Sequence, residues 1–191
     1  DAVSTATTAL LGCRFATSFR AVTAVGRVRA GEWVAVHGCG GVGLSAVAVA
    51  VAAGARVVAV DVSPSALAMA SDLGAEVALD ARGLGWEEVG GRVREATEGG
   101  AHVSLDALGS EATCAGSLAG LRVRGRHVQV GLLPPVLGLP QVPLHLVVAG
   151  ELELLGSHGM AAHAYPGLLS LVVAGRLDPD RLLTRRIGLD E

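Results

Sequence analysis

The sequence predicts an α/β fold in which helices cover both faces of a doubly wound parallel sheet. Three observations favour this class. Valine-rich segments alternate with segments of helical length, as in βαβ units. Apolar residues make up 51% of the chain and aromatic residues only 3%, so aliphatic side chains must build the core, as in buried parallel strands. A glycine-rich turn at residues 38–43 joins the first expected strand to a helix.

Six strands are expected, with helices between them. The strands are expected at residues 32–37, 56–61, 76–79, 102–107, 126–130 and 151–155. The helices are expected at 43–53, after the N-cap Ser63, at 86–98, after the N-cap Ser110, and at 166–174. The strand order of the usual dinucleotide-binding sheet is 3-2-1-4-5-6, and ligands bind where that order reverses. Four prolines between residues 134 and 143 predict an irregular loop after the fifth strand.

Composition and charge exclude several kinds of partner. The net charge is −3 and the arginines are scattered, so we expect no nucleic-acid partner. We expect no membrane association, because the sequence has no apolar run of about 18 residues. No basic segment precedes an apolar one at the start, so no secretory signal is expected and the protein is predicted to be cytoplasmic. Three cysteines are too few for a disulfide framework.

The turn at residues 38–43 reads Gly-Cys-Gly-Gly-Val-Gly, a G-x-G-x-x-G motif. Gly38 allows a tight turn, Gly40 lets the backbone approach a pyrophosphate, and Gly43 lets the helix pack closely. The phosphates would meet free N–H groups and the positive end of the helix dipole. The same motif could form an unliganded turn. Its position between a strand and a helix favours dinucleotide binding in a Rossmann domain.

Asp61 ends the second expected strand, 18 residues after Gly43. A carboxylate at this position can accept hydrogen bonds from the adenosine ribose hydroxyls, and it would repel a 2′-phosphate. No arginine occurs at residues 62–64 to hold such a phosphate. The alternative is a solvated acid at a strand end. We predict that the cofactor is NAD rather than NADP.

The chain resembles the zinc-dependent medium-chain alcohol dehydrogenases. The resemblance rests on Leu-Gly-Cys-Arg-Phe-Ala-Thr at 11–17, on residues 31–43, 58–61 and 156–159, and on Gly131. It implies a coenzyme-binding half that lacks the GroES-like catalytic domain. Residues 1–30 would be crossover helices from that missing domain. Residues 31–160 would be the NAD-binding Rossmann domain, and 161–191 the last helix and a truncated return segment.

The resemblance also implies roles for individual residues. Cys13 matches a zinc ligand whose partner ligands are not in this sequence, and zinc is therefore expected only in the intact enzyme. Thr17 matches a catalytic-site residue beside the nicotinamide, and Val42 matches the side chain behind the nicotinamide ring. From the residues alone, an isolated cysteine such as Cys13 is more often a buried packing residue. Thr17 and Val42 are likewise ordinary in a helix and a loop.

Further cofactor contacts are expected mainly from the main chain. The resemblance implies that Gly131, Ser157 and Gly159 hold the nicotinamide carboxamide through their backbone. Gly41 belongs to the phosphate loop, and Gly109 is expected to line the adenosine or nicotinamide-ribose side. Asp106 ends the fourth strand and is expected to be structural or at the cofactor rim. The remaining candidates are interpreted as structural: Cys39, Cys114, His37, His102, His127 and His145.

The function implied is NAD-dependent, zinc-assisted oxidation of an alcohol to an aldehyde or ketone, and the reverse. The isolated chain is expected to be inactive. One alternative is a zinc-free, quinone-reductase-like oxidoreductase of the same superfamily. Another is a stand-alone NAD-binding module without catalysis, which the fold alone does not exclude. The expected partners are a small alcohol or carbonyl substrate and a second copy of the chain, paired through the sixth strand at 151–155.

Overall fold

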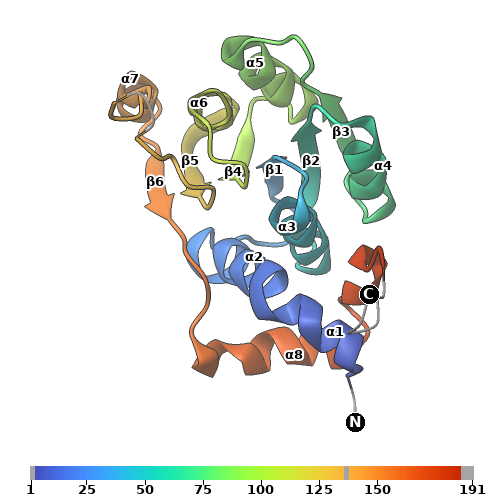
Figure 1. Cartoon of the computed structure of the whole chain (residues 1–191). Helices are drawn as coiled ribbons and strands as arrows, with labels where there is room; N and C mark the ends of the chain where they lie inside the picture. Colours follow the sequence, from blue (N-terminus) through green and yellow to red (C-terminus); the bar gives the residue numbers. More distant parts are fainter. Residues whose placement is uncertain (1–2, 136–137, 186–191) are drawn as a thin grey trace.

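The computed structural model describes residues 3–135 and 138–185. Its centre is a six-stranded, all-parallel sheet with the order β3-β2-β1-β4-β5-β6 (Figure 1). The predicted fold class and strand order are therefore confirmed. The order reverses between β1 and β4, and this switch point is where ligands bind in such sheets.

Four of the six strands lie within one residue of their predicted positions. The strands are β1 Trp33–His37, β2 Arg56–Asp61, β3 Val77–Asp80, β4 Ala101–Asp106, β5 Leu121–Gln129 and β6 Glu153–Gly156. The prediction was wrong for the start of β5, which begins at Leu121 and shifts register before Arg126. It was also wrong for the start of β6, because Glu151 has a φ of 47°, a left-handed conformation that strands do not adopt.

The helices account for most of the remaining chain. They are α1 Thr5–Leu10, η1 Leu11–Phe15, α2 Ala16–Arg20, η2 Ala21–Val25, α3 Gly41–Ala52, α4 Pro64–Asp72, α5 Trp86–Ala96, α6 Glu111–Ala119, α7 Leu144–Ala149, η3 Ala162–Ala164, α8 Tyr165–Val173 and η4 Pro179–Leu182. Helix α7 was not predicted, and it begins directly after Pro143, the last of the four prolines. None of its residues is buried, so no apolar periodicity marks it in the sequence.

Local signals fix the helix ends. Ser63 accepts a hydrogen bond from the Ala66 N–H and caps α4, and Ser110 forms a capping box with Thr113 at α6, so both predicted N-caps are confirmed. Helix α5 forms in spite of its glycines. A Cβ on Gly90 would lie 2.5 Å from Ala119 Cβ, so the glycine lets α5 and α6 pack closely.

Helix α3 packs between the sheet and the N-terminal helices (Figure 1). Its side chains are buried on nearly all sides, which explains why valines at 47, 49 and 51 gave no clear helical pattern. Phe15 and Leu168 belong to the same core cluster as Val47, so the two ends of the chain pack together under this face. Trp33, Val60 and Val93 belong to a second cluster on the other face, beneath α5.

A line of polar side chains crosses the buried part of β4 and β5. His127 Nδ1 lies 3.1 Å from the hydroxyl oxygens of both Ser104 and Ser117, which share its single lone pair. Its Nε2 donates to Gln129 Oε1 at 3.0 Å, and Gln129 Nε2 donates to Asp106 Oδ2 at 2.9 Å. Both ring nitrogens of His127 are therefore satisfied in one neutral tautomer.

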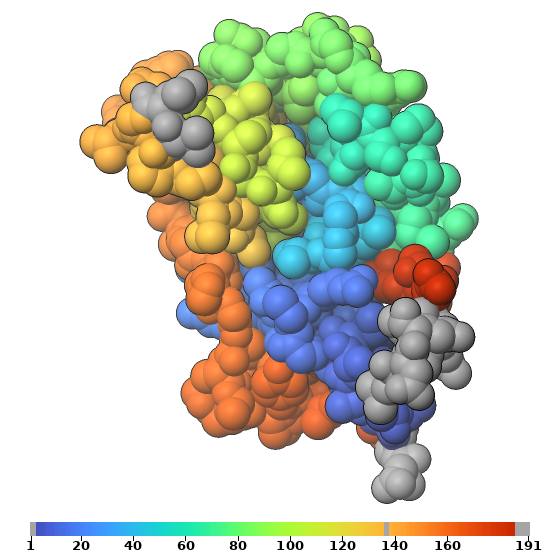
Figure 2. All heavy atoms as spheres, in the orientation of Figure 1, coloured from blue at the N-terminus to red at the C-terminus, as the bar shows by residue number. Residues whose placement is uncertain are grey.

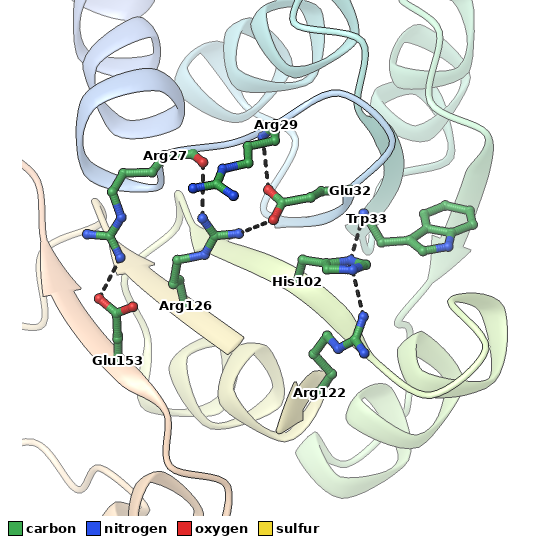
Figure 3. A network of polar contacts seen from close by, with 8 residues as sticks. All are labelled: Arg27, Arg29, Glu32, Trp33, His102, Arg122, Arg126 and Glu153. Atoms are coloured by element: carbon green, nitrogen blue, oxygen red, sulfur yellow. Dashed lines mark hydrogen bonds and ion pairs between the residues drawn. The ribbon is translucent and has the colours of Figure 1, made fainter. Parts of the chain in front are cut away.

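At the amino-terminal edge of the sheet, charged side chains tie the segment before β1 to β5 and β6 (Figure 3). Arg126 contacts Glu32 at 2.5 Å and also donates to the Arg27 carbonyl at 3.0 Å. Arg27 pairs with Glu153 at 2.5 Å. The Arg126 and Glu32 side chains are only 12% and 17% exposed, so this pair is poorly screened by water.

Replacing Arg126 should destabilise the fold more than replacing an exposed arginine. Arg126→Ala leaves Glu32 partly buried without its cation, and we expect the free energy of unfolding to fall by about 2 kcal/mol. The matched control is Arg82→Ala, which removes the exposed pair with Asp80 and should leave stability unchanged. Urea denaturation of both variants measures the difference, and equal losses would contradict the importance of burial.

Two buried histidines should make the fold sensitive to acid. Burial lowers the pKa of His37 from 6.5 to about 4, and burial also lowers the pKa of His127. The unfolded chain then binds more protons between these pH values, so stability is lost as the pH falls. For His37 alone, the free energy of unfolding should drop by about 3 kcal/mol between pH 6.5 and pH 4. Denaturation at several pH values checks this. The free energy of unfolding should fall less steeply with falling pH in His37→Phe than in the unchanged chain.

Candidate functional site

The predicted site residues lie along the carboxyl-terminal edge of the sheet. Gly38 follows β1, Asp61 ends β2, Gly109 follows β4, Gly131 follows β5 and Ser157 follows β6. Because the strands are parallel, all five positions lie at the same edge. In Figure 2, light-blue atoms, which the colour bar assigns to residues near 40, lie at the surface above the blue N-terminal part of the chain.

The glycine loop turns the chain sharply from β1 into α3. Gly38 has a φ of 85° and donates its N–H to the Val60 carbonyl at 2.9 Å. A Cβ on Gly43 would lie 1.7 Å from the Gly38 oxygen, so no side chain fits there. A Cβ on Gly40 would meet nothing within 4 Å, and the backbone at this residue therefore faces open space.

The amino terminus of α3 is open to an anion. Within residues 3–135 and 138–185, no side chain caps this helix, whose N-cap residue is Gly40. The first N–H groups of a helix have no partner within the helix and lie at its positive end. The loop therefore offers main-chain N–H groups of the kind that bind phosphates.

Asp61 connects the end of β2 to the glycine loop. Its Oδ2 accepts a hydrogen bond from the Cys39 N–H at 2.5 Å, and its Oδ1 accepts one from the Ser63 N–H at 2.8 Å. A carboxylate has about four lone-pair positions, so acceptor capacity remains for hydroxyl groups of a ligand. The side chain is half-buried, at the border of a cavity of about 240 Å³.

The cavity beside Asp61 is mostly apolar, and His37 is among its lining residues. Its lining also includes Val62, Trp86 and Ala112. His37 Nε2 is buried and has no hydrogen-bond partner among the described residues. The interpretation of His37 as structural is not tested by this missing partner and remains a prediction. The place of His37 in an apolar strand gave no hint of the missing partner, which is visible only in three dimensions.

Sequence reasoning also missed Arg14, which lies over the phosphate loop. A Cβ on Gly41 would come within 2.6 Å of Arg14 Cδ, so the arginine side chain passes directly over this glycine. Arg14 is exposed and lies in the π-helical turn η1. Such turns are frequent at functional sites. The available signal was an arginine directly after Cys13, but only the packing of η1 on α3 places it at the loop.

The crossover helices contact the loop from below. Ser18 donates its hydroxyl hydrogen to the Val42 carbonyl at 2.7 Å, which fixes α2 against the start of α3. Thr17 is half-buried on α2, and Cys13 is exposed on η1. Cys13 and Thr17 directly precede Arg14 and Ser18, which contact the loop, and the roles of Cys13 and Thr17 toward a ligand remain predictions.

The described residues do not form a complete zinc site. A catalytic zinc ion needs three protein ligands. In the part of the chain that the structure describes, no group of three or more His, Cys, Asp or Glu residues could hold a metal ion. The exposed thiol of Cys13 is available to a metal, but by itself it provides only one ligand.

The loops after β4 and β5 press against each other. A Cβ on Gly109 would lie 2.2 Å from the Leu132 oxygen, and one on Gly131 would lie 2.3 Å from the Gly109 nitrogen. Asp106 is fully buried and accepts the N–H groups of Leu108 and Gly109, both at 2.9 Å. Asp106 is thus structural here. The two glycines have a packing reason to be glycine, and their contacts to a ligand remain predictions.

The segment after β6 is held against both the sheet and α2. Ser157 is buried, and its N–H donates to the Gln129 carbonyl at 2.9 Å. Arg20 donates to Ser157 Oγ at 3.5 Å and to the His158 carbonyl at 3.4 Å. Gly159 has a φ of 60° and turns the chain away. Ser157 and Gly159 therefore lie close to the helix that carries Thr17.

The two other cysteines are unsuited to chemistry at this edge. Cys39 and Cys114 are both buried. Burial raises the pKa of the Cys39 thiol to about 12 and that of Cys114 to about 11, so both remain protonated near neutral pH. The prediction that Cys114 belongs to the core is confirmed.

Comparisons with known proteins place this site in a family. The family model for zinc-binding dehydrogenases matches residues 41–174. The alcohol dehydrogenase class-2 isozyme 2 of Oryctolagus cuniculus is 31% identical over 184 residues, which are 95% of this chain and 48% of the rabbit protein. The chain therefore spans about half the length of the curated relative it matches.

Solved structures agree with this match. An alcohol dehydrogenase zinc-binding domain protein from Burkholderia ambifaria is 34% identical, with a TM-score of 0.81 over 90% of this chain and 46% of that one. Benzyl alcohol dehydrogenase from Acinetobacter calcoaceticus is 27% identical, with a TM-score of 0.85 over 94% of this chain and 50% of that one. The chain belongs to the zinc-binding dehydrogenase family and corresponds to the coenzyme-binding half of its members.

Proposed function

We propose that this chain is the NAD-binding part of an alcohol dehydrogenase. The observation that carries the proposal is the contact between Asp61 and the glycine loop. It supports the proposal because the Asp61 carboxylate, which would accept ribose hydroxyls, lies beside the amino terminus of α3, where a pyrophosphate would bind. The family and the relatives that act on alcohols support the reaction class.

The residues present fit the adenosine diphosphate part of NAD. The N–H groups at the start of α3 would bind the pyrophosphate, with Gly40 leaving room for its approach. The guanidinium of Arg14 would neutralise part of its charge from above Gly41. Asp61 would accept the ribose hydroxyls and repel a 2′-phosphate, which favours NAD over NADP.

The nicotinamide end would lie toward α2 and the loops after β5 and β6. Thr17 and Val42 would contact the nicotinamide, and the backbone at Gly131, Ser157 and Gly159 would hold its carboxamide. When bound, NAD accepts a hydride from an alcohol or, when reduced, donates one to a carbonyl. The chain's own task is to fix the orientation of that ring.

Two parts of the proposal concern the intact protein. Cys13 would supply one thiolate to a zinc ion whose other ligands come from outside this chain. A second copy would pair through β6, which is the last strand of the sheet and carries Leu154 at 44% exposure.

Within the described residues, no helix is both long and apolar enough to cross a membrane.

Asp61 should decide between the two coenzymes. The unchanged chain should bind NADH at least about tenfold more tightly than NADPH, because the carboxylate repels the 2′-phosphate. Asp61→Ala should bring this ratio close to one. Asp80→Ala is the matched control, since Asp80 is the register partner of Asp61 on β3 and pairs with Arg82 instead. Fluorescence titration gives the ratio of NADPH to NADH dissociation constants for each protein. An unchanged ratio in Asp61→Ala would show that Asp61 does not decide between the coenzymes.

Arg14 should contribute to binding through its charge. Arg14→Gln removes one charge-assisted contact to the pyrophosphate, so the dissociation constant for NADH should rise about tenfold. The dependence of binding on salt should also weaken, because fewer charges are involved. Arg29→Gln, an exposed arginine at the opposite edge of the sheet, is the control and should bind normally. Equal affinities for Arg14→Gln and the control would refute the role of Arg14.

A further inference from the structure

Arginines from two distant segments of the sequence gather at the amino-terminal edge of the sheet, at the end opposite the glycine loop (Figure 3). One segment precedes β1 and the other belongs to β5. The arginines are Arg27, Arg29, Arg122, Arg124 and Arg126. Together with His102, the second residue of β4, they line an open pocket of about 390 Å³.

Positive charge exceeds negative charge in this pocket. Three of the arginines each have a carboxylate partner, in the pairs Arg126–Glu32, Arg27–Glu153 and Arg124–Glu151. Arg29 and Arg122 have no ion-pair partner in the described part of the chain. Two guanidinium charges are therefore left over, and a doubly negative group would balance them.

His102, beside Arg122, faces a hydrogen-bond donor on each side of its ring (Figure 3). The Trp33 backbone N–H donates to His102 Nδ1 at 3.0 Å, so the neutral ring carries its hydrogen on Nε2. Arg122 Nη1 lies 2.6 Å from this Nε2, and a guanidinium nitrogen can only donate. Two donors therefore meet at this contact.

No change in the protonation of His102 removes this conflict. Moving the hydrogen to Nδ1 sets it against the Trp33 N–H, and a second proton on the ring sets a donor against both neighbours. Burial and the charge of Arg122 lower the pKa of His102, so the ring is neutral near neutral pH. An acceptor shared by Nε2–H and the guanidinium would satisfy both donors. Arg122 is exposed, so its side chain has room to move and admit one.

We propose that this pocket binds a phosphate-type dianion, whose oxygens accept hydrogen bonds from His102 Nε2 and from the Arg122 guanidinium. The anion supplies the lone pairs that the two donors lack, and its charge balances Arg122 and Arg29. Guanidinium groups suit phosphate oxygens because they can donate two parallel hydrogen bonds. The site lies at the opposite edge of the sheet from the glycine loop, and it does not depend on the proposed function.

The test titrates the 191-residue chain with inorganic phosphate at mildly alkaline pH, where this ion is mostly doubly negative. Proton–nitrogen correlation spectra detect each histidine ring nitrogen through the carbon-bound hydrogens and report its tautomer. The His102 signals are assigned by their absence in His102→Gln. They should shift saturably with phosphate, and sodium chloride at the same ionic strength should produce no saturable shift.

Arginine variants show which site holds the phosphate. Arg122→Gln should raise the dissociation constant for phosphate at least about fivefold, because it removes a charged donor. Arg82→Gln is the matched control, since Arg82 is also exposed but is not part of the pocket lining. Arg14→Gln weakens the glycine loop instead, so it should leave the His102 titration unchanged. If Arg122→Gln does not fold, Arg29→Gln takes its place in the same comparison.

Selective weakening in Arg122→Gln would support the inference, and equal titrations of Arg122→Gln and Arg82→Gln would overturn it. His102 signals that phosphate does not move, or that chloride moves equally, would also overturn it. Phosphate binding that is lost only in Arg14→Gln would place the ion at the glycine loop alone, again against the inference. Glycerol 3-phosphate in the same titration distinguishes the sources: tighter binding than phosphate identifies a phosphate monoester as the ligand, and weaker binding identifies the free ion.

Discussion

The contact between Gly43 and the carbonyl of Gly38 is the constraint on which the rest of the site depends. An added Cβ at Gly43 would lie 1.7 Å from that oxygen, so α3 can begin this close to the end of β1 only with glycine. The close approach leaves the first N–H groups of α3 at the sheet edge, where no side chain of the described residues caps them. An anion site follows directly from this backbone geometry.

Other elements converge on the same turn from both sides. Asp61 holds the Cys39 N–H from the end of β2, and Ser18 holds the Val42 carbonyl from α2. Arg14 passes over Gly41 from the preceding π-helical turn. The N-terminal helices therefore complete the surface around the phosphate loop. Since α8 packs on these helices, the two ends of the chain support the site together.

Much of the fold could be predicted because its signals are local. The sequence pattern of strand, glycine turn and helix placed β1, α3 and Asp61, and serine N-caps placed the starts of α4 and α6. Helix α7 was not predictable in this way, since it is short and has no buried face. The start of β5 was missed because its first residues pair with β4 before a shift in register, which no periodic pattern reveals.

The candidate site was predictable where backbone geometry requires a particular residue, and unpredictable where side chains meet across the fold. The glycines and Asp61 belong to the first kind. Arg14 belongs to the second kind, because its position depends on how a helix packs over the loop. The partner that His37 Nε2 lacks among the described residues is likewise visible only in three dimensions. An arginine in a helix and a histidine in an apolar strand are both ordinary in the sequence itself.

The most direct test of the account is a crystal structure of the chain with ADP-ribose, the part of NAD that these residues are proposed to hold. The account predicts the diphosphate within hydrogen-bonding distance of the N–H groups at the start of α3, the adenosine ribose on Asp61, and the base in the cavity lined by His37 and Trp86. A ligand bound elsewhere, or an empty glycine loop at saturating ADP-ribose, would contradict it.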